Sequence, residues 1–326
     1  MSSDRRAEIM VPNNQEEKIN DSLYELSARR DQEPDIDIIF FHGLQVNLPF
    51  VGTKHSDAYK SSWACMSDPS VCWLQQWLGP DLLQEGTRAR VFSISYDSSA
   101  FQTSTSGRAD LHLISENLMN DIVFFRRSRL RGYRIGENWP VVLVGHSLGG
   151  LVLKHFVIEA QKRKDWLQRD PSAGANLQTV TDFLSNIRGV FYYSTPHNGA
   201  ALAELMQFWP GKTSPVVQFL RVLSKDSARL NSDFSTWRRL AAVQAWTLFE
   251  QNKTSFLGFH KLVVKEGSAR YDSDNVRSAA ADHFSICKPK FKRDVQYEWL
   301  VQFLEVILAS WATRKSGPAH DVRTHD

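Results

Sequence analysis

Residues 140–153 read PVVLVGHSLGGLVL. An apolar run suited to a buried strand enters the pentapeptide GHSLG at 145–149, and the chain then resumes as an apolar helix. The pentapeptide fits the pattern G-x-S-x-G, in which a sharp turn from strand to helix strains the serine backbone and exposes its hydroxyl. Glycine is favoured at both ends of the turn because a side chain there would collide with neighbouring backbone. The pattern predicts a nucleophilic Ser147, with the backbone N–H of Leu148 facing the negative charge that develops during acyl transfer.

Short apolar runs alternate with helical patterns along the chain, and no internal repeat is present. The expected strands cover residues 35–43, 89–97, 140–147, 188–196, 245–251 and 259–267. The expected helices cover residues 73–83, 111–130 and 148–163, two or three segments between 199 and 240, and 293–311. This alternation predicts an α/β fold with a mostly parallel central sheet, helices on both faces and a helical cap inserted at about 198–240.

Length and composition favour one large domain. The chain has 326 residues, 42% of them hydrophobic, which is enough to bury a sizeable core. We expect this domain at 35–312, between a flexible segment at 1–34 and a flexible tail at 313–326. The 39 basic and 36 acidic residues give a net charge of +3, which is too balanced for a nucleic-acid partner.

Targeting signals and cofactor motifs are not recognisable in the sequence. The first twenty residues lack an apolar core of signal-peptide length, and no run reaches the roughly 18 apolar residues of a membrane helix. These features predict a cytoplasmic protein, with association to an organelle left open. The three cysteines lack metal-ligand spacing and are expected as reduced thiols. We therefore expect neither a metal nor a cofactor.

A nucleophilic serine needs a base, and on this fold the acid and then the histidine follow the serine along the chain. His283 lies between the expected strand at 259–267 and the C-terminal helix, so it is the predicted base. Four other histidines suit the role less well, because they begin a strand, follow the fourth strand or belong to the tail: His260, His197, His320 and His325.

Several carboxylates could orient this base. Glu250 ends the expected strand at 245–251, the position at which this fold commonly carries its acid, and is the predicted acid. Asp272 and Asp274 follow the next expected strand and remain alternatives. Asp282 abuts His283 in sequence and would struggle to reach its far ring nitrogen, so we interpret it as a turn or surface residue.

The loop after the first expected strand should supply a second N–H to the oxyanion. His42 and Gly43 close that strand in the stretch FFHGLQ, and the N–H of Leu44 is the predicted donor beside that of Leu148. We interpret His42 as a structural hydrogen-bonding residue of this loop rather than as a second base.

The motifs together resemble the α/β-hydrolase superfamily, and within it the branch of serine-active-site-containing proteins, which is related to the GPI inositol-deacylases and lipases. The stretches that carry the resemblance run in order from about residue 36 to 290: IIFFHGL, GHSLGGLVLKHFVIEA, GVFYYSTPHNGA, LFEQ followed by LVVKEGSA, and DHFSICKP. The resemblance implies that Ser147 and His283 stand at the nucleophile and base positions, and it supports Glu250 as the acid. It implies a hydrolase or transacylase for acyl esters, of phospholipids or other lipids. The membrane location of longer relatives is not carried over.

The expected cap holds two apolar stripes that would pack it onto the body of the domain or line an acyl-chain pocket. The first stripe is Leu202, Leu205, Met206, Phe208 and Trp209; the second is Val216, Val217, Phe219, Leu220 and Leu223, with Val222 beside it.

Two basic clusters remain. The first, at 126–134, lies near a helix C-terminus, where cations are favourable in any case. The second, Lys288, Lys290, Lys292 and Arg293, follows His283 and is either a solvated loop or a peripheral contact with an anionic membrane. The sequence thus predicts an acyl ester or lipid substrate. The alternatives are a ligand-binding or signalling protein with little turnover, and an interaction adaptor acting through its polar termini.

Overall fold

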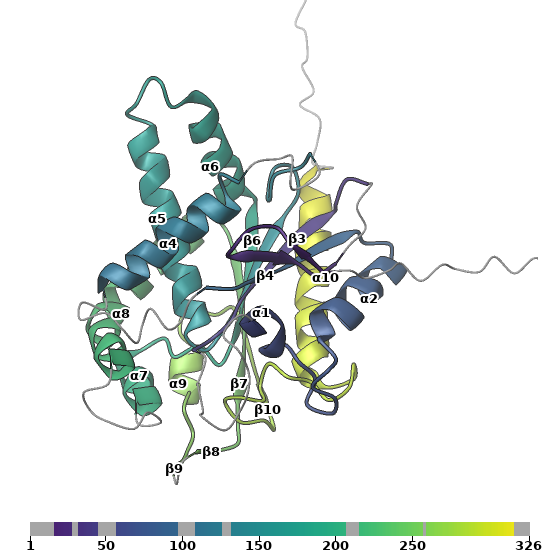
Figure 1. Cartoon of the computed structure of the whole chain (residues 1–326), viewed down its shortest axis with the longest axis vertical. Helices are drawn as coiled ribbons and strands as arrows, with labels where there is room; N and C mark the ends of the chain where they lie inside the picture. The colour runs from purple at the N-terminus through teal and green to yellow at the C-terminus, as the bar shows by residue number, and fades with distance from the viewer. Residues whose placement is uncertain are drawn as a thin grey trace, which may run out of the picture.

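The computed structural model describes residues 16–27, 32–44, 57–96, 108–125, 132–206, 215–256 and 259–315. Within these ranges, eight strands form one sheet in the order β1-β2-β4-β3-β5-β6-β7-β10 (Figure 1). The sheet strands are β1 Glu17–Lys18, β2 Leu23–Glu25, β3 Ile36–Phe41, β4 Ala89–Ile94, β5 Val141–His146, β6 Ile187–Tyr193, β7 Gln244–Glu250 and β10 Asn275–Ala279. All neighbours from β4 to β10 pair in parallel, whereas β1 and β2 are antiparallel additions at one edge. The predicted mostly parallel sheet is confirmed.

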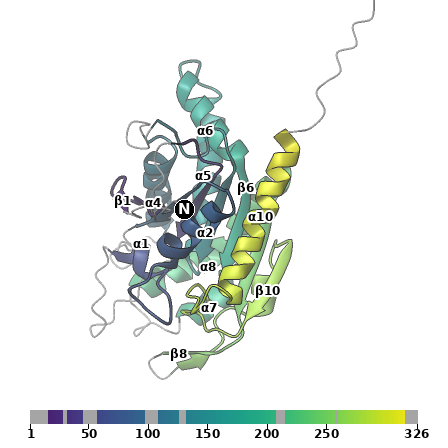
Figure 2. The ribbon, with the colours of Figure 1, turned by 90° about the vertical axis from the view of Figure 1, so that its right-hand side faces the viewer.

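Helices cover both faces of the sheet. Figure 2 shows α10 on one side of β6 and α5 and α6 on the other. The helices are α1 Ala58–Ser61, the π-helical turn η2 Leu74–Leu78, α2 Gly79–Gln84, α4 Arg108–Ile122, α5 Gly149–Leu167, α6 Gly174–Asn186, α7 Gly199–Met206, α8 Pro215–Leu240, α9 Glu266–Ala269 and α10 Val295–Lys315. Among the described residues, none of these helices combines the length and apolar character that a membrane span requires.

Two apolar cores lie against the two faces because successive strand residues point to opposite sides. In β5, Val141 and Leu143 pack with residues of α4, α5 and α6. Val142 and Val144 point the other way, into a core built from the α1–α2 region and α10. The second core is unusually aromatic, and its large buried side chains include Phe40, Trp63, Trp73, Phe191 and Phe303. The strands are therefore apolar on both faces, as the sequence predicted.

Among the described residues, the insertion between β6 and β7 holds α7 and α8. Its apolar residues Leu202, Leu205, Leu220 and Leu223 are buried in the same core as α5, so the prediction that they pack the insertion onto the body is confirmed. Phe208 and Trp209 lie outside the described residues, as do the side chains at 216, 217, 219 and 222.

Two strand predictions need correction. The stretch 259–267 is not a strand of the main sheet: only Phe259–Lys261 (β9) is extended, and it pairs antiparallel with β8, Thr254–Phe256. The edge position is taken by β10, which pairs parallel with β7. Asn275 and Arg277 of β10 are exposed, so this strand lacks the apolar run by which a buried strand is recognised.

Predictions at the chain ends also differ from the structure. A flexible segment at 1–34 is wrong for the described residues 17–25, because β2 pairs antiparallel with β4 and buries Leu23. The flexible tail predicted from 313 is wrong for its first three residues, since α10 continues to Lys315. Helix α6 was not predicted at all, and the predicted helix at 111–130 ends at Ile122, with 126–131 outside the described residues.

Candidate active site

Ser147 lies at the turn from β5 to α5. Its backbone φ is 53°, a left-handed conformation that is rare for a residue other than glycine. The N–H of Ser147 donates to the carbonyl of Tyr193 at 2.9 Å, which ties the turn to the end of β6. A Cβ on Gly145 would lie 2.5 Å from the backbone of Gly150, and one on Gly149 would lie 2.2 Å from the carbonyl oxygen of Phe41. The crowding expected at both glycines is therefore present.

His283 lies in the loop between β10 and α10, and its side chain contacts Ser147. Its Nε2 lies 2.8 Å from Oγ of Ser147, and both residues are buried. The histidine backbone is held at two points: its N–H donates to Oγ1 of Thr254 at 3.0 Å, and its carbonyl oxygen lies 2.9 Å from Nε2 of His146. The structure thus brings the predicted base to the predicted nucleophile, although the strand preceding the base is β10.

Glu250, at the end of β7, stands on the other side of the histidine. Its Oε1 lies 3.4 Å from Nδ1 of His283, longer than a normal hydrogen bond, and accepts the N–H of Val264 at 2.7 Å. Its Oε2 accepts the hydroxyl of Ser194. Because a carboxylate can only accept, its position favours the tautomer with the ring proton on Nδ1, which leaves Nε2 to accept from the hydroxyl of Ser147.

The charge of Glu250 is stabilised although its side chain is fully buried. Burial raises the pKa of the carboxyl, but the charge of His283 and the hydrogen bonds from Ser194 and Val264 outweigh it and leave the pKa below its usual value. The carboxylate is therefore ionised at neutral pH.

The alternative acids are bound elsewhere. Asp272 lies 2.9 Å from Nη2 of Arg238, and Asp274 lies 2.8 Å from Nη1 of the same side chain. Asp282 caps its own turn, because its Oδ1 accepts the N–H groups of Phe284 and Ser285.

The loop after β3 approaches the serine closely. A Cβ on Gly43 would lie 2.9 Å from Cβ of Ser147, so only glycine lets this backbone come so near. The loop is held by Tyr96, whose hydroxyl donates to the carbonyl of His42 at 2.5 Å and whose ring stacks on the imidazole. His42 itself contacts the carbonyl of Gly43 at 2.7 Å, a local structural contact. Leu44 therefore follows a backbone that is fixed beside Ser147, and Leu148 is the residue at the start of α5.

The chain has a mostly parallel sheet and a serine with strained backbone between a strand and a helix. A carboxylate and then a histidine follow this serine in the sequence, and the histidine lies between the two in space. The chain has the α/β-hydrolase fold. Comparison of sequences finds Protein SERAC1 of mouse, 27% identical over 305 residues, which are 90% of this chain and 42% of that protein. Human Protein SERAC1 is 28% identical over 328 residues, covering 95% and 45%. The chain thus spans less than half the length of these relatives.

Solved structures similar to the chain include an esterase and an α/β-hydrolase. Esterase B from Lactobacillus rhamnosus has 15% identity and a TM-score of 0.46, covering 90% of this chain and 82% of its own. The peroxisomal α/β-hydrolase Lpx1 from Saccharomyces cerevisiae has 10% identity and a TM-score of 0.44, covering 93% and 84%. No protein-family model matches the chain.

The three cysteines are not activated as nucleophiles in the structure. Cys65, Cys72 and Cys287 are free and buried, and burial raises the pKa of the first two thiols to about 11 and of the third to about 12. They are neutral thiols at physiological pH, as reduced cysteines in a core should be. Among the described residues, no group of three or more His, Cys, Asp and Glu side chains is arranged to hold a metal ion.

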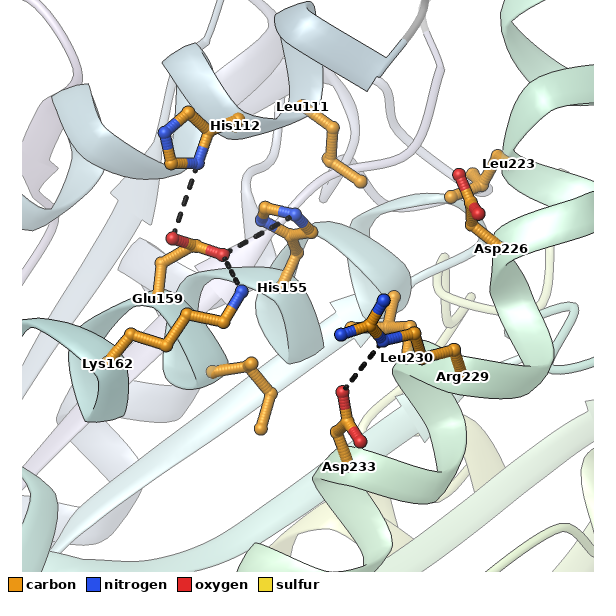
Figure 3. Close-up of a pocket in the computed structure, with 11 residues that line it drawn as sticks. Leu111, His112, His155, Glu159, Lys162, Leu223, Asp226, Arg229, Leu230 and Asp233 are labelled. Atoms are coloured by element: carbon orange, nitrogen blue, oxygen red, sulfur yellow. Dashed lines mark hydrogen bonds and ion pairs between the residues drawn. The ribbon is translucent and has the colours of Figure 1, made fainter.

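A cavity of about 580 Å³ lies between α4, α5 and α8 (Figure 3). Its polar wall is centred on Glu159, whose carboxylate lies 3.3 Å from His112 and 2.7 Å from Lys162. The lining residues of α5 run from His155 to Lys162, roughly 9 to 20 Å along the helix from Gly149 at about 1.5 Å of rise per residue.

Sequence reasoning missed the residues that hold the three predicted site residues in place. His146, Ser194, Thr254 and Tyr96 each make a hydrogen bond to one of them or to the neighbouring loop. His146 and Ser194 lie in motifs that were recognised, directly beside the nucleophile and after β6, but a pattern of residue types does not say which atoms meet.

Proposed function

We propose that the chain is a serine hydrolase or transacylase that cleaves a carboxylic ester through an acyl-enzyme on Ser147. One observation carries the proposal: Oγ of Ser147 and Nε2 of His283 are 2.8 Å apart, with the serine backbone at a φ of 53°. A serine hydroxyl is a weak nucleophile until a base takes its proton, and this contact supports that transfer.

The reaction follows from the positions of these atoms. Ser147 Oγ attacks the ester carbonyl while His283 Nε2 takes the hydroxyl proton, and the oxyanion accepts the N–H groups of Leu44 and Leu148. His283 then returns the proton to the leaving alcohol oxygen as the C–O bond breaks, which leaves the acyl group on Ser147. Water, or an alcohol in a transfer reaction, then attacks the acyl carbonyl while His283 takes its proton. The bond between the carbonyl carbon and Ser147 Oγ breaks, His283 returns the proton to Oγ, and the carboxylic acid or new ester leaves.

Glu250 acts on the histidine. Its carboxylate faces Nδ1, so it selects the tautomer whose Nε2 accepts the serine proton, and its charge stabilises the imidazolium that forms. His146, 2.9 Å from the carbonyl of His283, does not compete for this proton. Burial and the neighbouring charge of His283 lower the pKa of His146 to about 3, so it is neutral while the reaction runs.

The substrate we infer has a long apolar acyl group. The insertion that follows β6 begins with α7, an apolar helix that starts six residues after the strand ends. Since β6 is the parallel neighbour of β5, both strands end at the same edge of the sheet, and α7 starts near the edge at which Ser147 lies. An apolar wall beside a few placed polar groups is the surrounding that an ester of a long acid requires.

The loop after His283 supports a peripheral contact with an anionic membrane. Phe291 is 51% exposed and stands among the basic side chains of Lys290, Lys292 and Arg293. Met66 is 45% exposed, and its N–H donates to the carbonyl of Pro289, so a second apolar side chain belongs to the same surface. Lys292 is paired with Asp81, which offsets one of the positive charges. The remaining basic and apolar side chains form a surface that suits anionic headgroups and the outer part of the acyl region.

A fluorophosphonate probe tests the proposed chemistry directly, because it reacts with serines that a base has activated. We expect one adduct, found by peptide mass on Ser147, in the wild-type protein. Ser147→Ala should remove the adduct and His283→Ala should nearly remove it, while Ser278→Ala on the edge strand should label like wild type. A folded wild-type protein that never labels would refute the proposal and favour a ligand-binding protein with little turnover.

A further inference from the structure

The hydroxyl of Ser194 makes two hydrogen bonds to Glu250. Its Oγ accepts the backbone N–H of Glu250 at 3.1 Å and donates to Oε2 of the Glu250 side chain. A hydroxyl has one hydrogen, and since Oγ accepts the N–H, that hydrogen is directed to the carboxylate. Both residues are fully buried, so water does not compete for either bond.

The backbone of Ser194 is held in a conformation that serves these bonds. Its φ is 43°, in the left-handed region, and its N–H donates to the carbonyl of Leu248 at 2.8 Å. A strained backbone of this kind persists only when its surroundings over-determine it, and such residues gather at functional sites. The residue before it, Tyr193, accepts the N–H of Ser147 at 2.9 Å. The last residue of β6 and the residue that follows it thus hold the backbone of Ser147 and the side chain of Glu250.

The bond from Ser194 decides which oxygen of the acid faces the histidine. With Oε2 bound to Ser194, the carboxylate cannot rotate freely, and Oε1 is left between the N–H of Val264 and Nδ1 of His283. The contact of Oε1 with Nδ1 is 3.4 Å, so it depends on the carboxylate being held in place rather than on a short bond of its own.

We propose that Ser194 is a positioning residue of the catalytic unit, which keeps the carboxylate of Glu250 turned toward His283. It touches neither substrate nor the reacting atoms, and acts through Glu250 alone. The inference rests on the proposed serine-hydrolase function for its kinetic consequences, whereas the hydrogen bonds that carry it are independent of turnover.

The test compares Ser194→Gly and Ser194→Ala with the wild-type protein on a soluble p-nitrophenyl ester. Both variants lose the hydroxyl, but glycine adopts a positive φ freely, so it separates the lost hydrogen bond from backbone strain. We expect kcat to fall roughly tenfold or more in both, with KM changed by less than about twofold, because a hydrogen bond to a charged group is removed. Ser278→Ala, on the strand beside β7, is the matched control and should keep its activity.

A second readout does not need turnover. The proton on Nδ1 of protonated His283 should give a low-field resonance in the proton NMR spectrum at acidic pH, and Ser194→Gly should move it upfield or broaden it through exchange. A Ser194→Gly protein with wild-type kcat, or with an unchanged resonance, overturns the inference. Full turnover by Ser147→Ala would instead refute the proposed function, and the NMR comparison would still decide the role of Ser194.

Discussion

Nε2 of His146 lies 2.9 Å from the backbone carbonyl oxygen of His283, so the residue preceding Ser147 also holds the loop that carries His283. His146 is neutral because burial and the charge of His283 lower its pKa to about 3, and its Nε2–H is the donor of this bond. The contact joins two segments 137 positions apart in the chain, and it links the turn after β5 to the loop after β10.

Removing this hydrogen bond should make the position of the His283 ring less fixed. We expect His146→Ala to lower kcat by roughly threefold to tenfold, since an ordinary hydrogen bond contributes about 0.5–1.5 kcal/mol. His260→Ala, an exposed histidine on β9, is the control and should retain wild-type kcat. Equal kcat values for His146→Ala and wild type on a soluble ester would show that the contact does not position the base.

The identity of the acid can be decided by comparing two carboxamide variants. Glu250→Gln should lower kcat by roughly 10³-fold or more, because the amide can present its N–H₂ to Nδ1 and disfavour the reactive tautomer. Asp272→Asn should leave kcat near wild type while lowering stability, because Asp272 binds Arg238 rather than His283. Steady-state kinetics beside denaturant unfolding separates the two effects, and the reverse pattern would reassign the acid to Asp272.

Two ion pairs join the starts of β3 and β4, and the pair of Asp37 and Arg90 should contribute more to the free energy of unfolding. Asp37 is fully buried and binds Arg90 through both oxygens, at 2.7 and 2.8 Å, and it also accepts the N–H groups of Gly136 and Trp139. We expect Asp37→Asn to cost about 3–5 kcal/mol of unfolding free energy, since Arg90 keeps a buried charge without its partner.

The neighbouring pair of Asp35 and Arg88 is the matched control. It has similar contacts, with 2.6 Å between Nη2 and Oδ1, but its side chains are 35% and 38% exposed. Asp35→Asn should therefore cost less than about 1 kcal/mol when the unfolding free energies of both variants are measured by urea titration. Equal losses for the two variants would contradict the assignment of the first pair as a buried anchor.

Stability should fall in mild acid because His155 is kept neutral by the fold. Burial, with the charge of Lys162, lowers its pKa to about 4 against the attraction of Glu159. Its unfolded pKa is near 6.5, so the unfolded chain binds more protons between these values and stability is lost as pH falls from about 6.5 to 4. His155→Gln should reduce this loss by on the order of 1–3 kcal/mol when unfolding free energies are compared at both pH values. A pH dependence identical to wild type would exclude His155 as its source.

The surface around Phe291 should decide binding to anionic vesicles. We expect the combined variant Lys288→Ala, Lys290→Ala and Phe291→Ala to bind vesicles of phosphatidylcholine and phosphatidylserine roughly tenfold or more weakly than wild type, with a weaker dependence on salt. Its activity on a soluble ester should be unchanged. Arg163→Ala with Arg169→Ala, exposed basic residues near the end of α5, is the control, and equal vesicle binding by all three proteins would rule out this surface.

The local sequence around Ser147 determined the backbone conformation of the turn between β5 and α5. The apolar run of β5, the two glycines and the apolar start of α5 leave few conformations open to the serine, so its positive φ follows from steric limits within a few residues. The parallel sheet was also predictable, because its central strands are buried on both faces and therefore read as apolar runs.

The edge strand was not predictable in the same way. The polar stretch 275–279 is extended because β7 offers it a ladder of hydrogen bonds, whereas the apolar stretch at 262–264 supplies buried side chains and the Val264 N–H that binds Glu250. Only the folded chain provides these partners, so no short-range sequence pattern shows which of the two stretches forms the edge strand.

The distances within the site were likewise set by the tertiary structure. The sequence named a serine, a histidine and three candidate carboxylates, but these residues span more than a hundred positions. The pairing of Asp272 and Asp274 with Arg238, and of Glu250 with Ser194 and Val264, depends on which strand ends meet at one edge of the sheet. Side-chain chemistry is local to each residue, whereas the choice of partner depends on contacts between distant segments that exist only after folding.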